Sequence, residues 1–254
     1  MSAFGILASG LTATQTNLAD AAANLANRNT DGYGALQAAT ANRPSGVARP
    51  AQTLLEQTGL RPDLLTGNGV AMGPSALQWS ASIQPTGIPT NLAVRGSGFF
   101  VVTPSGGGVA YTRNGAFTAN AAGQLALPNG AVLAGLHRAP PGSTVHIAAD
   151  GQVTAVSPQG TRTPLGTIRL AAFANASGLA PQAGTLYTAT AASGRAYLQP
   201  ATATTLVPGA VNGSGVSLTQ SVTALIADQT AYGATADALK VEGTVAQTTD
   251  SLHI

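Results

Sequence analysis

The chain has 254 residues, of which 8% are charged and 4% are aromatic, while glycine alone contributes 31. This length suits one sizeable domain or two to three small ones, but so few charges are unfavourable on the surface of a free monomer, which favours a subunit that buries surface against others. The formal net charge is +2, and the ten arginines between Arg28 and Arg195 form no run, which argues against a nucleic-acid groove.

The first predicted element is an amphipathic helix over residues 3–28. Its apolar and small residues recur at alternating steps of four and three, namely Leu7, Leu11, Thr14, Leu18, Ala21 and Leu25. This spacing makes a narrow seam suited to a partner helix. Turn-forming residues from Asn27 to Gly32 end the helix near Arg28. No basic segment precedes the apolar stretch, so a cleaved secretory signal is not expected.

Residues 35–70 are predicted to form an extended, partly irregular connector. Pro44, Gly46, Pro50 and Pro62 argue against a long helix there. From residue 71 to residue 211 the pattern changes to short apolar runs, which predicts a compact antiparallel β domain.

The strand candidates of that β domain are Leu77–Ile83, Leu92–Val94, Phe99–Val102, Val109–Thr112, Gln124–Leu127, Val132–Leu136, Thr144–Ala148, Val153–Val156, Thr167–Phe173, Leu186–Thr190 and Ala196–Leu198. Asn114-Gly115, Asn129-Gly130 and Asp150-Gly151 are dipeptides typical of β-hairpin turns. Residues 200–213, rich in Pro, Gly and Asn, are predicted to be a linker.

A second amphipathic helix is predicted over residues 216–252. Its seam has the same spacing as the first, with Leu218, Val222, Leu225, Gln229, Tyr232, Ala236 and Leu239. From residue 216 to the end, four acids and one lysine give a net charge of −3. The predicted fold class is therefore α+β. Residues 1–34 and 212–254 form a helical domain paired as a coiled coil, 35–70 the connector and 71–211 the central β domain.

No constellation in the sequence indicates catalysis, a cofactor or a metal. His137, His146 and His253 lack metal-ligand spacing, and the carboxylates are spread singly. Gly96-Ser97-Gly98 precedes a predicted strand, whereas a phosphate-binding loop opens a helix, so a β-turn or a bulge is expected. No apolar run reaches the roughly 18 residues of a membrane span. We expect neither an enzyme nor a membrane-inserted protein.

The sequence resembles the flagellar axial proteins, the rod and hook proteins of the bacterial flagellum. The resemblance is carried by seven ordered blocks along nearly the whole chain. They are residues 9–17, 23–33, 91–100, 111–117, 173–179, 184–194 and 215–232. The positions that match the family's motifs are Asn24, Leu25, Asn27, Thr30, Gly32, Tyr33, Gly96, Gly98, Phe99, Phe100, Tyr111, Arg113, Gly115 and Gln229. Length and residues 69–87 are most similar to distal-rod members, with a proximal-rod or hook member as the alternative.

The resemblance implies a structural subunit that polymerises helically into a hollow drive shaft, which transmits torque and forms an export channel. The paired helices would line the tube. The inter-subunit seam would comprise Leu7, Leu11, Leu18, Leu25, Leu218, Val222, Leu225, Tyr232 and Leu239. The implied partners are further copies, other rod and hook proteins, bushing-ring proteins and the type III export apparatus. The implied location is the periplasm-spanning rod of the basal body, reached without a cleaved signal peptide.

Two other classes of function stay open at this point. A hydrolase on the β scaffold would need carboxylates or histidines to converge in a pocket. A non-flagellar coiled-coil adaptor or secreted adhesin would be a stable monomer or a small closed oligomer. The alternative for the seams is a purely intramolecular role, in which the two helices pack only on each other and on the β domain.

Overall fold

A computed structural model describes residues 3–38, 40–42, 70–73, 75–80, 82–182, 184–202 and 205–251. The chain divides into two compact units. The helical unit comprises residues 1–25, 36–76 and 218–254, and the β unit comprises residues 26–35 and 77–217. Most of the predicted connector, residues 43–69, lies outside the described residues.

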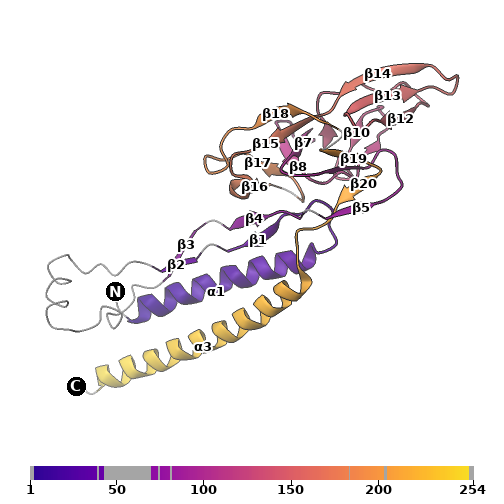
Figure 1. The fold of residues 1–254 in the computed structure, drawn as a ribbon. Helices are drawn as coiled ribbons and strands as arrows, with labels where there is room; N and C mark the ends of the chain where they lie inside the picture. The colour runs from indigo at the N-terminus through magenta and orange to yellow at the C-terminus, as the bar shows by residue number, and fades with distance from the viewer. Residues whose placement is uncertain are drawn as a thin grey trace. The chain divides into compact units, whose positions relative to one another are not determined.

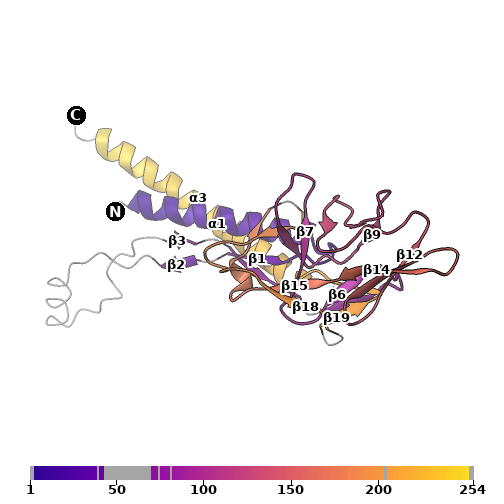
Figure 2. The ribbon, with the colours of Figure 1, turned by 90° about the horizontal axis from the view of Figure 1, so that it is seen from above.

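The helical unit contains two long helices, as predicted. Helix α1 spans Ala3–Ala26 and helix α3 spans Leu218–Ser251, close to the predicted ranges 3–28 and 216–252. The helices lie side by side in both views and run in opposite directions (Figures 1 and 2). A methyl group built on Gly10 would lie 3.9 Å from the Cγ2 atom of Thr235, so small residues let the two helices approach.

Threonine side chains of both helices are hydrogen-bonded to their own helix. The Thr12 hydroxyl donates to the Ala8 carbonyl at 3.0 Å, and those of Thr230 and Thr235 donate to the carbonyls four residues earlier at 2.8 and 2.7 Å. Thr16 and Thr248 repeat this pattern. Such bonds satisfy the hydroxyl without a partner outside the helix.

Short strands follow α1 in the chain. Strand β2 (Thr40–Asn42) pairs antiparallel with β3 (Val70–Met72), and β1 (Ala35–Gln37) pairs with β4 (Ala76–Gln78). The Asn24 side chain of α1 donates to the Leu36 carbonyl and accepts from the Leu36 N–H, both at 2.7 Å. This amide satisfies both polar backbone groups of one extended residue, which fixes that residue against the helix.

The strand pairings described for the β unit are antiparallel, which agrees with the predicted class. Its largest sheet has nine strands. They are β7 (Phe99–Thr103), β8 (Ala110–Thr112), β9 (Thr118–Ala119), β10 (Leu125–Ala126), β11 (Val132–Leu133), β15 (Arg169–Ala172), β16 (Ala180–Pro181), β17 (Tyr187–Thr188) and β18 (Tyr197–Pro200). A short 3-10 helix, η2, spans Ala176–Gly178.

Three smaller sheets complete the β unit. A three-stranded sheet contains β12 (Thr144–Ile147), β13 (Gln152–Val156) and β14 (Arg162–Thr167). Strand β6 (Leu92–Val94) pairs with β19 (Leu206–Pro208), and β5 (Ile83–Pro85) pairs with β20 (Ala210–Asn212). Residues 83–94 thus pair with residues 206–212, far along the chain.

Two of the three predicted hairpin turns are confirmed. Asn129-Gly130 joins β10 to β11, and Asp150-Gly151 joins β12 to β13. Gly130 and Gly151 have φ values of +83° and +84°, the left-handed region that glycine adopts at little cost. The hairpin predicted at Asn114-Gly115 is wrong, because β8 and β9, the strands on either side, pair with other strands and not with each other.

The predicted linker over residues 200–213 is also wrong. It contains the end of β18 and the whole of β19 and β20. Strand β20 is buried along its length, and Asn212 is 1% exposed. Strands of three residues are too short to show the alternation that identifies strands in a sequence.

The core of the β unit lies on both sides of β7, because neighbouring residues of a strand face opposite ways. Phe100 belongs to the main apolar cluster and meets Phe117 edge-on, with ring centroids 5.2 Å apart. Phe99 packs on the other side, 4.9 Å from Trp79 and 5.7 Å from Phe173 between ring centroids. Both phenylalanines are fully buried.

Truncation of Phe99 to alanine should lower the free energy of unfolding by about 3–5 kcal/mol, because a buried ring is replaced by a cavity. Chemical denaturation of the purified chain followed by tryptophan fluorescence measures this loss. Val109→Ala is the matched control, since Val109 is 57% exposed in the same unit. Equal and small losses for both variants would contradict a core role for Phe99.

Candidate functional site

The predicted seam of α1 is only partly covered within one copy of the chain. Its four leucines at positions 7, 11, 18 and 25 are half-buried. The buried residues of this helix are Ala13, Ala21 and Asn24. Only Ala21 among them belongs to the predicted spacing. The leucine side of α1 therefore keeps apolar surface that a further partner can cover.

Helix α3 shows the same incomplete coverage. Leu225, Tyr232 and Leu239 are half-buried, and Gln229 is exposed. Leu218 and Val222 are 51% and 37% exposed.

Ile226 continues the row of Leu218 and Val222 at the same spacing of four and is 60% exposed. Residues four apart in a helix are neighbours on one face. We call Leu218, Val222 and Ile226 the apolar row of α3. It is an exposed apolar surface of the kind that marks interaction sites.

The ends of the two helices meet in a junction that belongs to the β unit. We define this helix-root junction as residues 27–34 and 212–215. The Gly32 N–H donates to the Asn212 carbonyl, and the Gly215 N–H donates to the Tyr33 carbonyl, both at 2.8 Å. The Ser214 hydroxyl donates to the carbonyl of Asn27 at 2.9 Å. The place where α1 ends and the place where α3 begins are thus held together.

A turn at residues 27–32 directs the chain into this junction, as the sequence predicts. The Thr30 hydroxyl donates to the Asn27 side-chain oxygen at 3.2 Å, and the Thr30 carbonyl accepts the Tyr33 N–H, also at 3.2 Å. The Gly34 N–H donates to the Tyr187 hydroxyl at 2.9 Å. Burial raises the pKa of Tyr187 to about 12.

Glycine is required at the junction because backbones approach closely. A Cβ atom on Gly32, whose φ is +67°, would lie 2.1 Å from the Asn114 nitrogen. A Cβ atom on Gly34 would lie 2.8 Å from the Trp79 indole, and one on Gly115 would lie 1.5 Å from the Leu92 oxygen.

Asn212 connects the junction to strand β6. Its side-chain oxygen accepts the Val94 N–H at 2.7 Å, and its side-chain nitrogen donates to the Val94 carbonyl at 2.8 Å. With its own carbonyl bonded to Gly32, this one residue joins the N-terminal turn, β20 and β6. The sequence analysis missed Asn212 because it lies in the segment predicted to be a linker.

Arg113 is buried beneath the junction, with 6% exposure. Its guanidinium carbon lies 4.9 Å from the Phe99 ring centroid and 5.6 Å from that of Trp79, distances typical of cation–π contact. It donates to the carbonyls of Ser80, at 3.4 Å, and Gly96. Burial lowers the pKa of Arg113 to about 10. The cation is therefore held by rings and carbonyls.

The other predicted motif positions support the same region. Gly96, with φ +89°, lies in a bend between β6 and β7, and no helix opens there. A Cβ atom on Gly98 would lie 3.1 Å from Val94, and Tyr111 meets Phe173 at 4.8 Å between centroids. Trp79 is not among the predicted motif positions. It is the single tryptophan of the chain, and this rarity could have marked it as a candidate.

The described residues contain no group of three or more His, Cys, Asp or Glu side chains that could hold a metal ion. Within the same part of the chain, no helix is long and apolar enough to cross a membrane. The features that remain are the half-covered helices and the buried junction.

Comparison with known proteins identifies the family. Residues 93–161 match the family described as flagellar hook protein FlgE/F/G D1 domain. The flagellar basal-body rod protein FlgG of Agrobacterium fabrum is 30% identical over 91% of this chain and 92% of its own length. FlgG of Caulobacter vibrioides is 29% identical over the full length of both chains. This chain belongs to the flagellar basal-body rod protein family.

A second kind of rod protein matches a shorter stretch. The flagellar basal-body rod protein FlgF of Escherichia coli is 32% identical over 59% of this chain and 56% of its own length. The family places this chain in the flagellar basal body as a structural protein of motility. The D1 match covers β7 to β13, which includes Phe99, Arg113 and Gly115.

In this rod protein, Gly115→Ala should lower the free energy of unfolding by about 1–3 kcal/mol. The added methyl group collides with the backbone of Leu92, so β6 must shift. Gly106→Ala is the control, because a Cβ atom there meets nothing within 4 Å. Thermal denaturation of both variants measures the difference. Equal melting temperatures would contradict the close approach of residues 115 and 92.

The raised pKa of Tyr187 predicts an alkaline loss of stability in the rod protein. The unfolded tyrosine loses its proton near pH 10, whereas the folded one keeps it to about pH 12. The folded state therefore binds more protons in this window, and the free energy of unfolding falls as pH rises from about 10 to about 12. Urea titrations of the natural chain and of Tyr187→Phe across this window should show a steeper fall for the natural chain. Parallel curves would contradict the assignment.

Proposed function

We propose that this chain is the subunit of the distal flagellar rod and polymerises helically into a hollow shaft. The observation that carries the proposal is the apolar row of α3, which one copy leaves exposed on a protein of the rod family. Further copies would cover it. The FlgG relatives match about nine-tenths or more of the chain, whereas FlgF matches 59%, which favours the distal over the proximal rod.

In the proposed shaft, residues 1–34 and 212–254 form the inner tube, with α1 and α3 paired as a coiled coil. The seam leucines at 7, 11, 18, 25, 218, 225 and 239, with Val222 and Tyr232, make the contacts between copies. Residues 35–70 are the rod-type connector and 71–211 the outer β layer. Head-to-tail contacts that do not close into a ring generate a filament.

The shaft would transmit motor torque and form the channel through which later subunits are exported. Its partners would be further copies, the neighbouring rod and hook proteins, bushing-ring proteins and the type III export apparatus. The helix-root junction supports a load-bearing role, because several hydrogen bonds and close backbone contacts hold both helix roots in the β unit. Load applied to the β unit would reach both roots at once.

Electron microscopy of the purified full-length chain at high concentration tests the proposal, beside a truncated chain that lacks residues 1–30 and 216–254. Straight hollow tubes from the full chain alone are expected. A monodisperse particle whose terminal helices already resist protease would overturn the proposal and favour an adaptor. Restored swimming in a strain that lacks its own FlgG, but not in one that lacks FlgF, would distinguish distal from proximal rod.

Leu18→Asp and Leu225→Asp should each abolish polymerisation, because a charge in a covered apolar seam loses its hydration without a partner. Gln15→Asp and Thr223→Asp are matched controls at exposed positions of the same helices. Sedimentation measures polymer, and circular dichroism confirms equal helix content. Normal polymerisation of both leucine variants would count against the seam.

A further inference from the structure

Strand β18 is an exposed edge of the nine-stranded sheet. Among the described strands it pairs with β15 alone. All four of its residues are exposed, and Tyr197 and Leu198 are 63% and 55% exposed. An edge strand with large apolar side chains and no charge of its own invites another chain to cover it.

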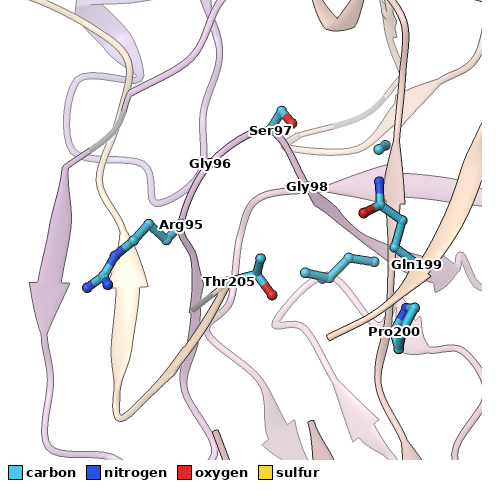
Figure 3. A pocket seen from close by; sticks show the side chains of 9 residues that line it. Arg95, Gly96, Ser97, Gly98, Gln199, Pro200 and Thr205 are labelled. Carbon is cyan, nitrogen blue, oxygen red and sulfur yellow. The ribbon is translucent and has the colours of Figure 1, made fainter. Parts of the chain in front are cut away.

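Two exposed arginines lie on the partner strand of this edge or shortly before it in sequence. Arg169 lies opposite Pro200 in the β15–β18 register, and Arg195 precedes the strand by two residues. A pocket of about 200 Å³ beside the strand has Gln199 and Pro200 on one side and Arg95 on the other (Figure 3). Sites for small molecules are usually larger than roughly 300 Å³, so this pocket suits a side chain of a partner.

The β unit as a whole is basic. Its seven arginines and two aspartates give a charge of +5. All of these arginines except the buried Arg113 are exposed. In the β15–β18 register Leu198 lies on the same face of the sheet as Arg169, whereas Tyr197 lies on the opposite face. We call Leu198, Arg169 and Arg195 the β18 patch.

Helix α3 carries a surface of opposite charge. Asp237, Val241 and Val245 follow one another at steps of four and so share one face. The two valines are 62% and 59% exposed. Leu239, half-buried, is two residues from Val241 and therefore points another way. We call Asp237, Val241 and Val245 the acidic row.

The carboxylates near the acidic row have weak or incomplete partners within the chain. Asp237 forms an ion pair with Lys240 at 3.4 Å, and both side chains are more than three-quarters exposed. Such a pair exchanges readily for another. The Oε2 atom of Glu242, next to Val241, is shielded from solvent and has no hydrogen-bond partner among the described residues. By contrast, the apolar row of Leu218, Val222 and Ile226 includes no charge.

We propose that the acidic row of α3 docks on the β18 patch of a second copy of this chain. The inference rests on the proposed assembly and names one of its contacts. Val241 and Val245 would cover Leu198, while Asp237 would face Arg169 and Arg195. Charge favours this occupant, because α3 carries −3 and the β unit +5. Complementary potentials favour the correct register.

Cysteine cross-linking tests this contact directly, because the natural chain contains no cysteine. One full-length chain carries Leu198→Cys and another, distinguished by a size tag, carries Val241→Cys. The two are mixed at the concentration used for electron microscopy, and then oxidised. We expect a disulfide-linked heterodimer at least tenfold more abundant than either homodimer. Val109→Cys mixed with Val241→Cys is the control, since Val109 is equally exposed but lies outside the patch.

Charge reversal supplies the second measurement. Arg195→Glu in the Leu198→Cys chain should lower the heterodimer yield about tenfold, and Asp237→Arg in the Val241→Cys chain should restore it. A heterodimer yield that stays unchanged in both charge-reversal variants would contradict the proposed charge pairing. Circular dichroism of each variant checks that it folds.

The outcomes separate this contact from the proposed function. Tubes that form without a cross-link between positions 198 and 241 overturn the docking and leave the rod proposal standing. A cross-link without tubes supports the docking and overturns the rod proposal. Neither tubes nor a cross-link overturns both.

Discussion

The structure depends on the close meeting of backbones at the helix-root junction. Ser214 and Asn27, whose hydrogen bond helps to close it, are 187 residues apart in sequence. Neither root can be fixed until the strands between them have formed, because Gly32 bonds to Asn212 and Asn212 bonds to Val94. Such non-local closure is entropically costly and slow to form. Once formed, it joins the residues that follow α1 to the residues that precede α3 within the β unit.

The small net charge of the chain conceals two strongly charged parts. The β unit is basic and the long C-terminal helix is acidic, while the total is only +2. A low average charge therefore does not describe either surface. Opposite signs on separate parts of one chain favour contacts in which the basic part of one copy meets the acidic part of another. The composition and the exposed apolar rows have a common explanation if copies cover one another in the rod.

The sequence predicted the long elements well and the short ones poorly. Both terminal helices are close to their predicted ranges because many turns of regular spacing define them. Asn129-Gly130 marks a hairpin, but the same dipeptide at 114–115 does not, because Gly115 is there to admit the Leu92 carbonyl. A local turn signal cannot distinguish these two uses of glycine.

The site was recognisable only in part. The motif resemblance selected Gly32, Arg113 and Asn24, which the structure places at hydrogen-bonded or closely packed positions. It could not select Asn212, whose role arises from a strand pairing across more than one hundred residues. The leucine spacing identified the apolar sides of the helices. How much of each side remains uncovered depends on three-dimensional packing, which spacing alone does not contain.

The back-bonded threonines change what the helix surfaces offer to a passing molecule. A hydroxyl that donates to its own helix, as in Thr12 or Thr230, has no proton left to give, and its methyl group becomes the outward feature. A surface that is polar by composition then has few free hydroxyl donors. Along a conduit lined by such helices, an unfolded chain would meet weak, short-lived adhesion and slide with low friction.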